Sequence, residues 1–352
     1  MDSNKVEIAH LTAKNRKKAA LSMCKTVLFL MAVTAMSDFL SLSFALLVEK
    51  FSPELVRGIA KVFVLFGSSR TEGYTAARLV LSSDSFSKII GMVVTFFSLV
   101  VPAVFFAKIE RVEPEKSFNV NGKLVKPFVP VFCLCHLFTT FASVFSGTIN
   151  DFMLPESSEV YQSLTGVVSQ KFNLYEFIVS VLCVAVFVPL VEEYVFRGVL
   201  FSYLSRYGLH FGIVASAVVF GIAHISPVQS VYAFVFGILS ATLVAVTGNI
   251  KTSVIFHSLN NFLTVVLGYI MGAVSSEQFG LINCFYLMVA SSLGIYGFYV
   301  LCRDGGIMSK LSKAADENDN PHIEKCGMKQ IVVLPLVVYL AYYVYSVFKM
   351  VM

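Results

Sequence analysis

The sequence predicts an all-α protein, a multi-pass transmembrane helical bundle with eight or nine spans. Hydrophobic residues make up 57% of the 352-residue chain and charged residues only 14%, whereas about a quarter of the residues in an ordinary soluble domain are charged. The mean hydropathy is +0.77, and the apolar residues gather into runs near the ~20 residues that a helix needs to cross a bilayer. The lipid bilayer is therefore the first predicted partner.

The first predicted span runs from Thr26 to Val48, after a polar and basic N-terminus at residues 1–25. It is longer than the apolar core of about 7 to 15 residues in a cleavable signal peptide, so we expect it to stay as a membrane helix. Further spans are expected at residues 88–107, 127–149, 174–200, 211–226, 228–247, 251–272, 279–301 and 331–350.

Basic residues beside the spans predict the orientation. If the N-terminus is cytoplasmic, the basic loops 108–126 and 303–330 lie inside and the acidic loop around Asp151 lies outside. We expect the plasma membrane of a bacterium. Residues 49–87 disagree, because they would lie outside yet carry five Lys and Arg; either 54–66 dips into the interface or the span count is off by one. The net charge of +5 is too small and too interleaved with spans to predict a nucleic-acid partner.

The cysteines give no redox or metal motif. There are seven and none forms a C-x-x-C pair, so we interpret them as small hydrophobic residues. Cys133, Cys135 and His136 form a suggestive trio, but positions i and i+2 of a helix point apart, so the three do not converge on one metal.

Three ionisable residues interrupt the apolar run VPLVEEYVFRGVLF at residues 188–201. If this run is helical, Glu193 and Arg197 share one face with the Glu N-terminal, the better orientation for an ion pair. Glu192 then points about 100° away and has no dedicated cation, which suits a general base or acid. The alternative is that both carboxylates share Arg197 in a pair that locks the bundle.

Two further motifs follow at helical spacing. Phe220 and His224 are one turn apart in FGIAHISP, and His257 and Asn261 are one turn apart in FHSLNNF. Alone, the first could be an interfacial His and the second a hydrogen-bond clamp between helices. Together with Glu192 they supply a carboxylate, two imidazoles and an amide. Those are the groups needed to activate water and stabilise an oxyanion in amide hydrolysis.

The ordered triple resembles the signature motifs of the CPBP intramembrane protease family. This family includes the type II CAAX prenyl endopeptidases, the Abi proteins, and bacteriocin-processing and lysostaphin-resistance-like proteins. The resemblance implies a membrane endopeptidase whose protease core spans residues 173–272, between N-terminal helices and loops at 26–172 and a C-terminal part at 273–352 with its polar loop at 303–330. Its substrate would be a peptide or lipidated protein, such as a prenylated CAAX-type C-terminus or a bacteriocin or leader peptide.

Residue by residue, the resemblance implies that Glu192 activates water and that His224 helps to hold the water and the carbonyl. His257 and Asn261 would stabilise the oxyanion, and the supporting residues would be Glu193, Arg197 and Phe220.

No cofactor is firmly predicted. By residue type, Glu192, His224 and His257 are able to hold zinc. However, the motif H-E-x-x-H is absent, and the amide of Asn261 is a better oxyanion donor than zinc ligand. We therefore expect a metal-free reaction. His224 and His257 can meet only if the segment 211–226 is short or tilted and ends near mid-membrane.

Two other functions are compatible with the motifs. Carboxylates and imidazoles in membranes also form the relays of proton-coupled transporters, although these predict polar residues along the depth of several helices. The third interpretation is a non-catalytic scaffold or immunity protein in which the motifs only tie the bundle together.

Overall fold

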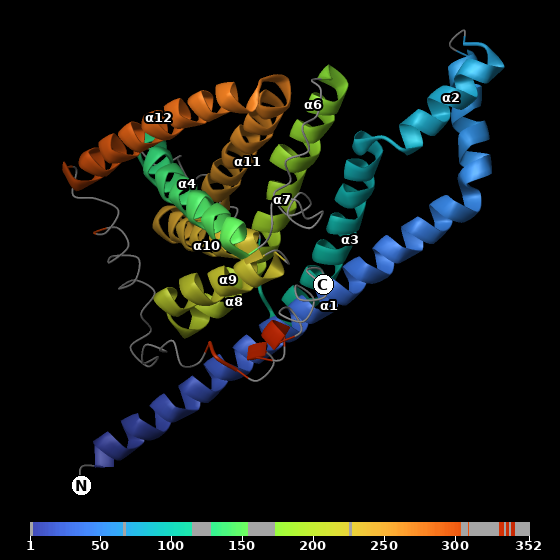
Figure 1. Cartoon of the computed structure of the whole chain (residues 1–352). Coiled ribbons are helices and arrows are strands. Elements are labelled where there is room, and N and C mark those ends of the chain that lie inside the picture. The colour runs from blue at the N-terminus through green and yellow to red at the C-terminus, as the bar shows by residue number, and fades with distance from the viewer. Residues whose placement is uncertain are drawn as a thin grey trace.

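The computed structural model describes residues 3–65, 68–114, 128–153, 173–224, 227–303, 309, 331–333, 336–337 and 339–341. Every regular element among them is a helix (Figure 1). Six helices are long and apolar enough to cross a membrane, and two shorter apolar helices cover 129–145 and 209–223. The all-α, multi-pass class is therefore confirmed. Most of the predicted span 331–350 and of the polar loop 303–330 lies outside the described residues.

The bundle consists of long single helices and one composite rod. The single helices are α1 (Ser3–Leu65), α2 (Arg70–Leu81), α3 (Asp84–Glu110), α4 (Phe128–Met153), α9 (Leu209–Ala223), α10 (Pro227–Thr247), α11 (Ile250–Ala273) and α12 (Ser276–Arg303). The rod joins α6 (Leu174–Ser180), the π-helix η2 (Val181–Phe187), α7 (Val188–Glu193), the π-helix η3 (Tyr194–Phe201), α8 (Ser202–Leu204) and the 3₁₀ turn η4 (Ser205–Tyr207).

Helix α1 differs from the prediction. The expected span 26–48 and the expected interfacial piece 54–66 belong to one 63-residue helix that extends to Leu65. At about 1.5 Å per residue it is roughly three times as long as a hydrocarbon core is thick, so it is not a single simple span. The helix changes direction in its second half (Figure 1), where Pro53 lies. Proline removes a backbone hydrogen bond and kinks a helix.

Small residues allow the closest helix contacts. The most extensive pairings are α9 with α10, α4 with α12, α1 with α2 and α4 with α10. A Cβ on Gly237 of α10 would lie 2.9 Å from Cα of Ala217 on α9, and a Cβ on Gly297 of α12 would collide with the carbonyl of Pro130 on α4. Membrane helices associate through such close backbone approaches. These contacts set α9 and α10 beside the rod that carries the charged residues.

Candidate active site

The three motifs come from three parts of the bundle. Glu192 and Glu193 are the last two residues of α7, and Arg197 lies in η3. Phe220 lies in the last turn of α9, and α11 carries the third motif. A fourth helix, α10, contacts both α9 and α11. The site is therefore assembled from long-range contacts, although each motif is local.

Glu193 is fully buried and has three partners. One carboxylate oxygen, Oε2, lies 3.2 Å from Nε of Arg197, and both side chains are at most 1% exposed. The same oxygen accepts a hydrogen bond of 2.9 Å from the hydroxyl of Ser240. The other oxygen, Oε1, lies 2.9 Å from Nδ1 of His257. The predicted ion pair at i, i+4 forms. Together, the three partners leave neither oxygen of Glu193 free for a substrate.

Arg197 is enclosed by aromatic rings. Its guanidinium carbon lies 4.3 Å from the ring centre of Phe220 and 5.9 Å from that of Phe236. None of its buried nitrogens makes a hydrogen bond to a described residue. A desolvated cation over an aromatic face gains about 2 kcal/mol, so Phe220 stabilises the charge of Arg197. The supporting role of Phe220 stays a prediction, and this contact is the one through which it would act.

Glu192 occupies a different environment from Glu193. Its side chain is 15% exposed, and Oε2 lies 3.7 Å from Nε2 of His257. No other ion pair or hydrogen bond joins it to the described residues. The imidazole of His257 therefore lies between two carboxylates, with Glu193 at Nδ1 and Glu192 at Nε2. Arg197 forms its ion pair with Glu193, and no ion pair joins it to Glu192 among the described residues.

The π-helix η2 explains the contact of Asn261. In a π-helix the carbonyl of Val184 would accept a hydrogen bond from residue 189, but residue 189 is proline and has no N–H. The N–H of Val188 does not serve this carbonyl either, because it bonds to the carbonyl of Cys183. Nδ2 of Asn261 donates to the Val184 carbonyl at 2.9 Å. One hydrogen of the amide is thereby used, and no hydrogen bond joins Asn261 to Glu192 in the described part of the chain.

His224 caps α9. Its Nδ1 lies 2.9 Å from the carbonyl of Phe220, and since a carbonyl only accepts, Nδ1 donates and Nε2 keeps its lone pair in the neutral ring. Its ring and that of His257 lie 4.8 and 6.1 Å from the ring of Phe220. Helix α9 has only 15 residues, about 22 Å of rise against a hydrocarbon core of ~30 Å. The short helix removes the expected separation between the two histidines.

Sequence reasoning missed three residues. Ser240 and Phe236 lie on α10, between the motifs, and no spacing within the chain relates them to Glu193 or Arg197. Asn260 neighbours Asn261 but faces another way. It is 4% exposed and bonds to Tyr232 and His136. A signal for this cluster was readable on α4, where His136, Thr139 and Ser143 recur at helical spacing in an apolar run.

The zinc alternative needs Glu192, His224 and His257 to converge on one metal ion. Within the described ranges no three His, Cys, Asp or Glu side chains are arranged to hold a metal ion. A metal-free reaction stays a prediction that activity measurements must test.

Comparison with known proteins supports the sequence interpretation. Residues 174–263 match the model of a family described as type II CAAX prenyl endopeptidase, Rce1-like. No curated protein and no solved structure matches the chain. The matched segment contains the three motifs, which confirms the predicted resemblance. It also confirms the predicted enzyme class, a membrane endopeptidase.

Proposed function

We propose, on the basis of the match between residues 174–263 and the model of the type II CAAX prenyl endopeptidase family, that Glu192 activates a water molecule that attacks a peptide bond held at or within the bilayer. The observation that carries this proposal is the difference in environment between the two adjacent carboxylates, Glu192 and Glu193. Glu193 is buried with three partners, whereas Glu192 is partly exposed beside Nε2 of His257.

His257 is the proposed oxyanion donor. Ionised Glu193 can only accept at Nδ1, so that nitrogen carries a proton. To donate at Nε2 as well, His257 must act as the imidazolium, with both ring nitrogens protonated. The Nε2–H would then face the place where Glu192 acts.

The proposed reaction balances without a metal. Glu192 takes a proton from water as the water oxygen bonds to the substrate carbonyl carbon, and the carbonyl oxygen becomes an oxyanion stabilised by Nε2–H of His257. Collapse of this intermediate breaks the C–N bond, and Glu192 returns the proton to the leaving amine. Nε2 of His224 has a free lone pair in the neutral ring and would accept a hydrogen bond from the attacking water. The second hydrogen of the Asn261 amide would assist at the oxyanion.

The proposed substrate class is taken from the family description and from the membrane location of the site. A prenylated CAAX-type C-terminus is the class that the family description names, and a hydrophobic leader peptide is the other candidate. The N-terminus of the protease is proposed to be cytoplasmic, following the basic loops. A transporter is less well supported. Among the described residues, the Asp, Glu, Lys and Arg side chains that are buried are Glu193 and Arg197, which form one pair instead of a series through the bundle.

The experiment uses the full chain in proteoliposomes with three peptides. These are a farnesylated CAAX peptide, the same peptide without the farnesyl group, and an apolar leader-type peptide that lacks the cysteine. Mass spectrometry identifies the products and the bond that is cut. We expect at least one peptide to be cleaved by the wild type and not by Glu192→Gln. The matched control is Glu277→Gln, which makes the same change at an exposed carboxylate at the start of α12 and should keep full activity. Cleavage that survives Glu192→Gln would contradict the mechanism.

A further inference from the structure

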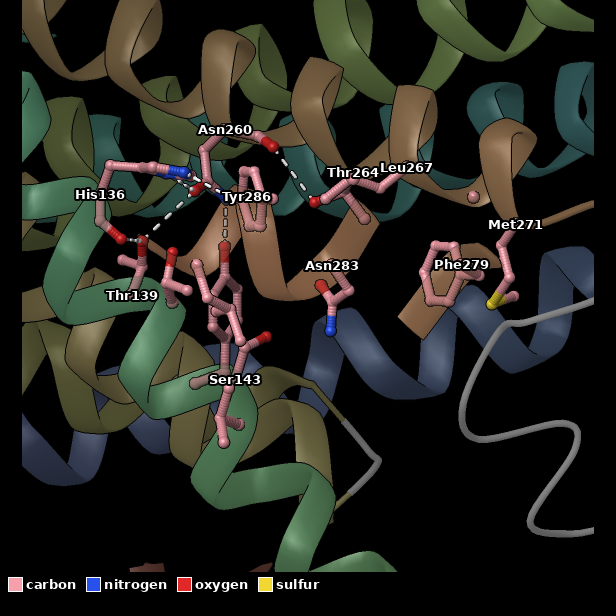
Figure 2. Close-up of a pocket in the computed structure, with 15 residues that line it drawn as sticks. His136, Thr139, Ser143, Asn260, Thr264, Leu267, Met271, Phe279, Asn283 and Tyr286 are labelled. Atoms are coloured by element: carbon pink, nitrogen blue, oxygen red, sulfur yellow. Dashed lines mark hydrogen bonds between the residues drawn. The ribbon is translucent and has the colours of Figure 1, made fainter. Parts of the chain in front are cut away.

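A second polar feature lies beside the candidate active site. A cavity of about 360 Å³ opens between α4, α10, α11 and α12, within the range of about 300–1,000 Å³ typical of ligand pockets. Figure 2 shows its polar end around His136, Asn260 and Tyr286, with Met271 and Phe279 away from that end. The cavity does not include the three motifs.

The polar end is a closed hydrogen-bond network. Oδ1 of Asn260 can only accept, so Nδ1 of His136, at 3.3 Å, carries the proton. In the neutral ring, Nε2 of His136 then accepts from the hydroxyl of Tyr286 at 2.6 Å. The ring of Phe132 stacks on that of His136 at 5.6 Å. His136 is thus fixed in orientation by contacts at both ring nitrogens and on one face of the ring.

Other polar groups of the cavity are left open. Ser143 on α4 and Asn283 on α12 line the cavity, and neither makes a hydrogen bond to a described residue. Of the fifteen described residues that line it, none is Asp, Glu, Lys or Arg. A cavity that offers open hydrogen-bonding groups and no counter-charge suits an uncharged ligand that both donates and accepts. Peptide backbone has this chemistry, whereas a lipid chain offers no hydrogen-bond partner.

The cavity and the candidate active site share a wall. The ring of Tyr232, which bonds to Asn260, stacks on Phe236 at 6.2 Å. Phe236 in turn contacts the ring of His257 at 4.6 Å. Asn260 also lies three residues after His257 on α11. A peptide with its scissile bond beside Glu192 would therefore have this cavity within reach of its flanking residues.

We propose that this cavity is a substrate subsite that binds an uncharged, apolar segment of the peptide beside the scissile bond. Ser143 and Asn283 hydrogen-bond its backbone, and the end with Met271 and Phe279 takes its side chains. The inference rests on the proposed endopeptidase function, which it deepens by excluding charged residues from one flank of the cleavage site.

The first test measures kinetics with the farnesylated CAAX peptide carrying two valines after the prenylated cysteine. Ser143→Leu and Asn283→Leu each remove an open group and fill space. We expect KM to rise up to about tenfold, the loss of roughly one net hydrogen bond, with kcat little changed. Cys284→Leu is the control, because residue 284 is exposed, neighbours Asn283 on α12 and does not line the cavity.

The second test does not depend on cleavage. The variant Glu192→Gln/Cys284→Ala/Asn283→Cys is labelled with N-ethylmaleimide, and modification at position 283 is followed by mass spectrometry with and without the same peptide. Bound peptide should slow the labelling several-fold, and a peptide with aspartates in place of the valines should not.

The outcomes separate the two proposals. Cleavage by the wild type with unchanged KM in both leucine variants and no protection at position 283 would overturn the subsite. Protection without cleavage by the wild type would support the subsite and contradict the proposed function. Neither cleavage nor protection would contradict both.

Discussion

The buried ion pair gives the sharpest stability prediction. Glu193→Gln keeps the shape of the side chain but removes its charge, so Arg197 is left at 1% exposure without its partner. Removing one member of a buried pair costs about 3–5 kcal/mol, because the remaining charge is uncompensated. At ~2–4 °C per kcal/mol, this predicts a fall in Tm of roughly 10 °C.

Thermal unfolding in detergent checks this value. The chain has no Trp, so circular dichroism or a thiol-reactive dye that reports exposure of the buried Cys135 is the suitable probe. The matched control is Glu54→Gln. It removes the same charge from an exposed pair with Arg57 at 2.9 Å, where an ion pair contributes about 0–1 kcal/mol.

A double variant separates charge from packing. Glu193→Gln/Arg197→Met removes both charges and should recover much of the lost stability, because a buried pair replaced by neutral groups is often close to neutral in energy. The reasoning is refuted if Glu193→Gln unfolds at the same temperature as Glu54→Gln. It is also refuted if the double variant is less stable than the single one.

Three further predictions use the same assays. Asn261→Leu leaves the carbonyl of Val184 without its hydrogen-bond donor. In thermal unfolding it should lower stability by about 1–3 kcal/mol, and kcat should fall as well. Unchanged stability and unchanged kcat would contradict the role proposed for Asn261. Gly297→Ala forces a methyl group against the carbonyl of Pro130 and should lower Tm by a few degrees, whereas Gly280→Ala on the same helix meets nothing within 4 Å and should not. Preincubation with 1,10-phenanthroline should leave peptide cleavage unchanged; inhibition that zinc reverses would establish metal dependence.

The sequence predicts local relations of this fold better than distant ones. Hydropathy locates the apolar helices, and i, i+4 spacing finds the Glu193–Arg197 pair, because both depend on neighbouring residues. The unbroken length of α1 escapes such reasoning, since the polar residues around Pro53 resemble a loop. The π-helices escape it as well. No periodic pattern in the sequence marks either of them, and only η2 has a proline, Pro189, just after its end.

The site shows the same limit. Spacing singles out Glu192, His257 and Asn261, but it does not show that His257 lies between two carboxylates. That contact joins residues 64 and 65 positions apart. Asn260 and Asn261 are indistinguishable by type. Tertiary packing alone directs Asn260 to His136 and Asn261 to Val184.

The measurement that tests the central claim most directly is cleavage by Glu192→Gln and Glu193→Gln side by side, with Tm recorded for each. Glu192→Gln should lower kcat by about 10²–10⁴, the contribution of a positioned general base, and keep the Tm of the wild type. Glu193→Gln should lose stability first, and its folded fraction should still contain the base. A Glu192→Gln protein that keeps its wild-type kcat, or that loses activity only because it unfolds, would contradict the account.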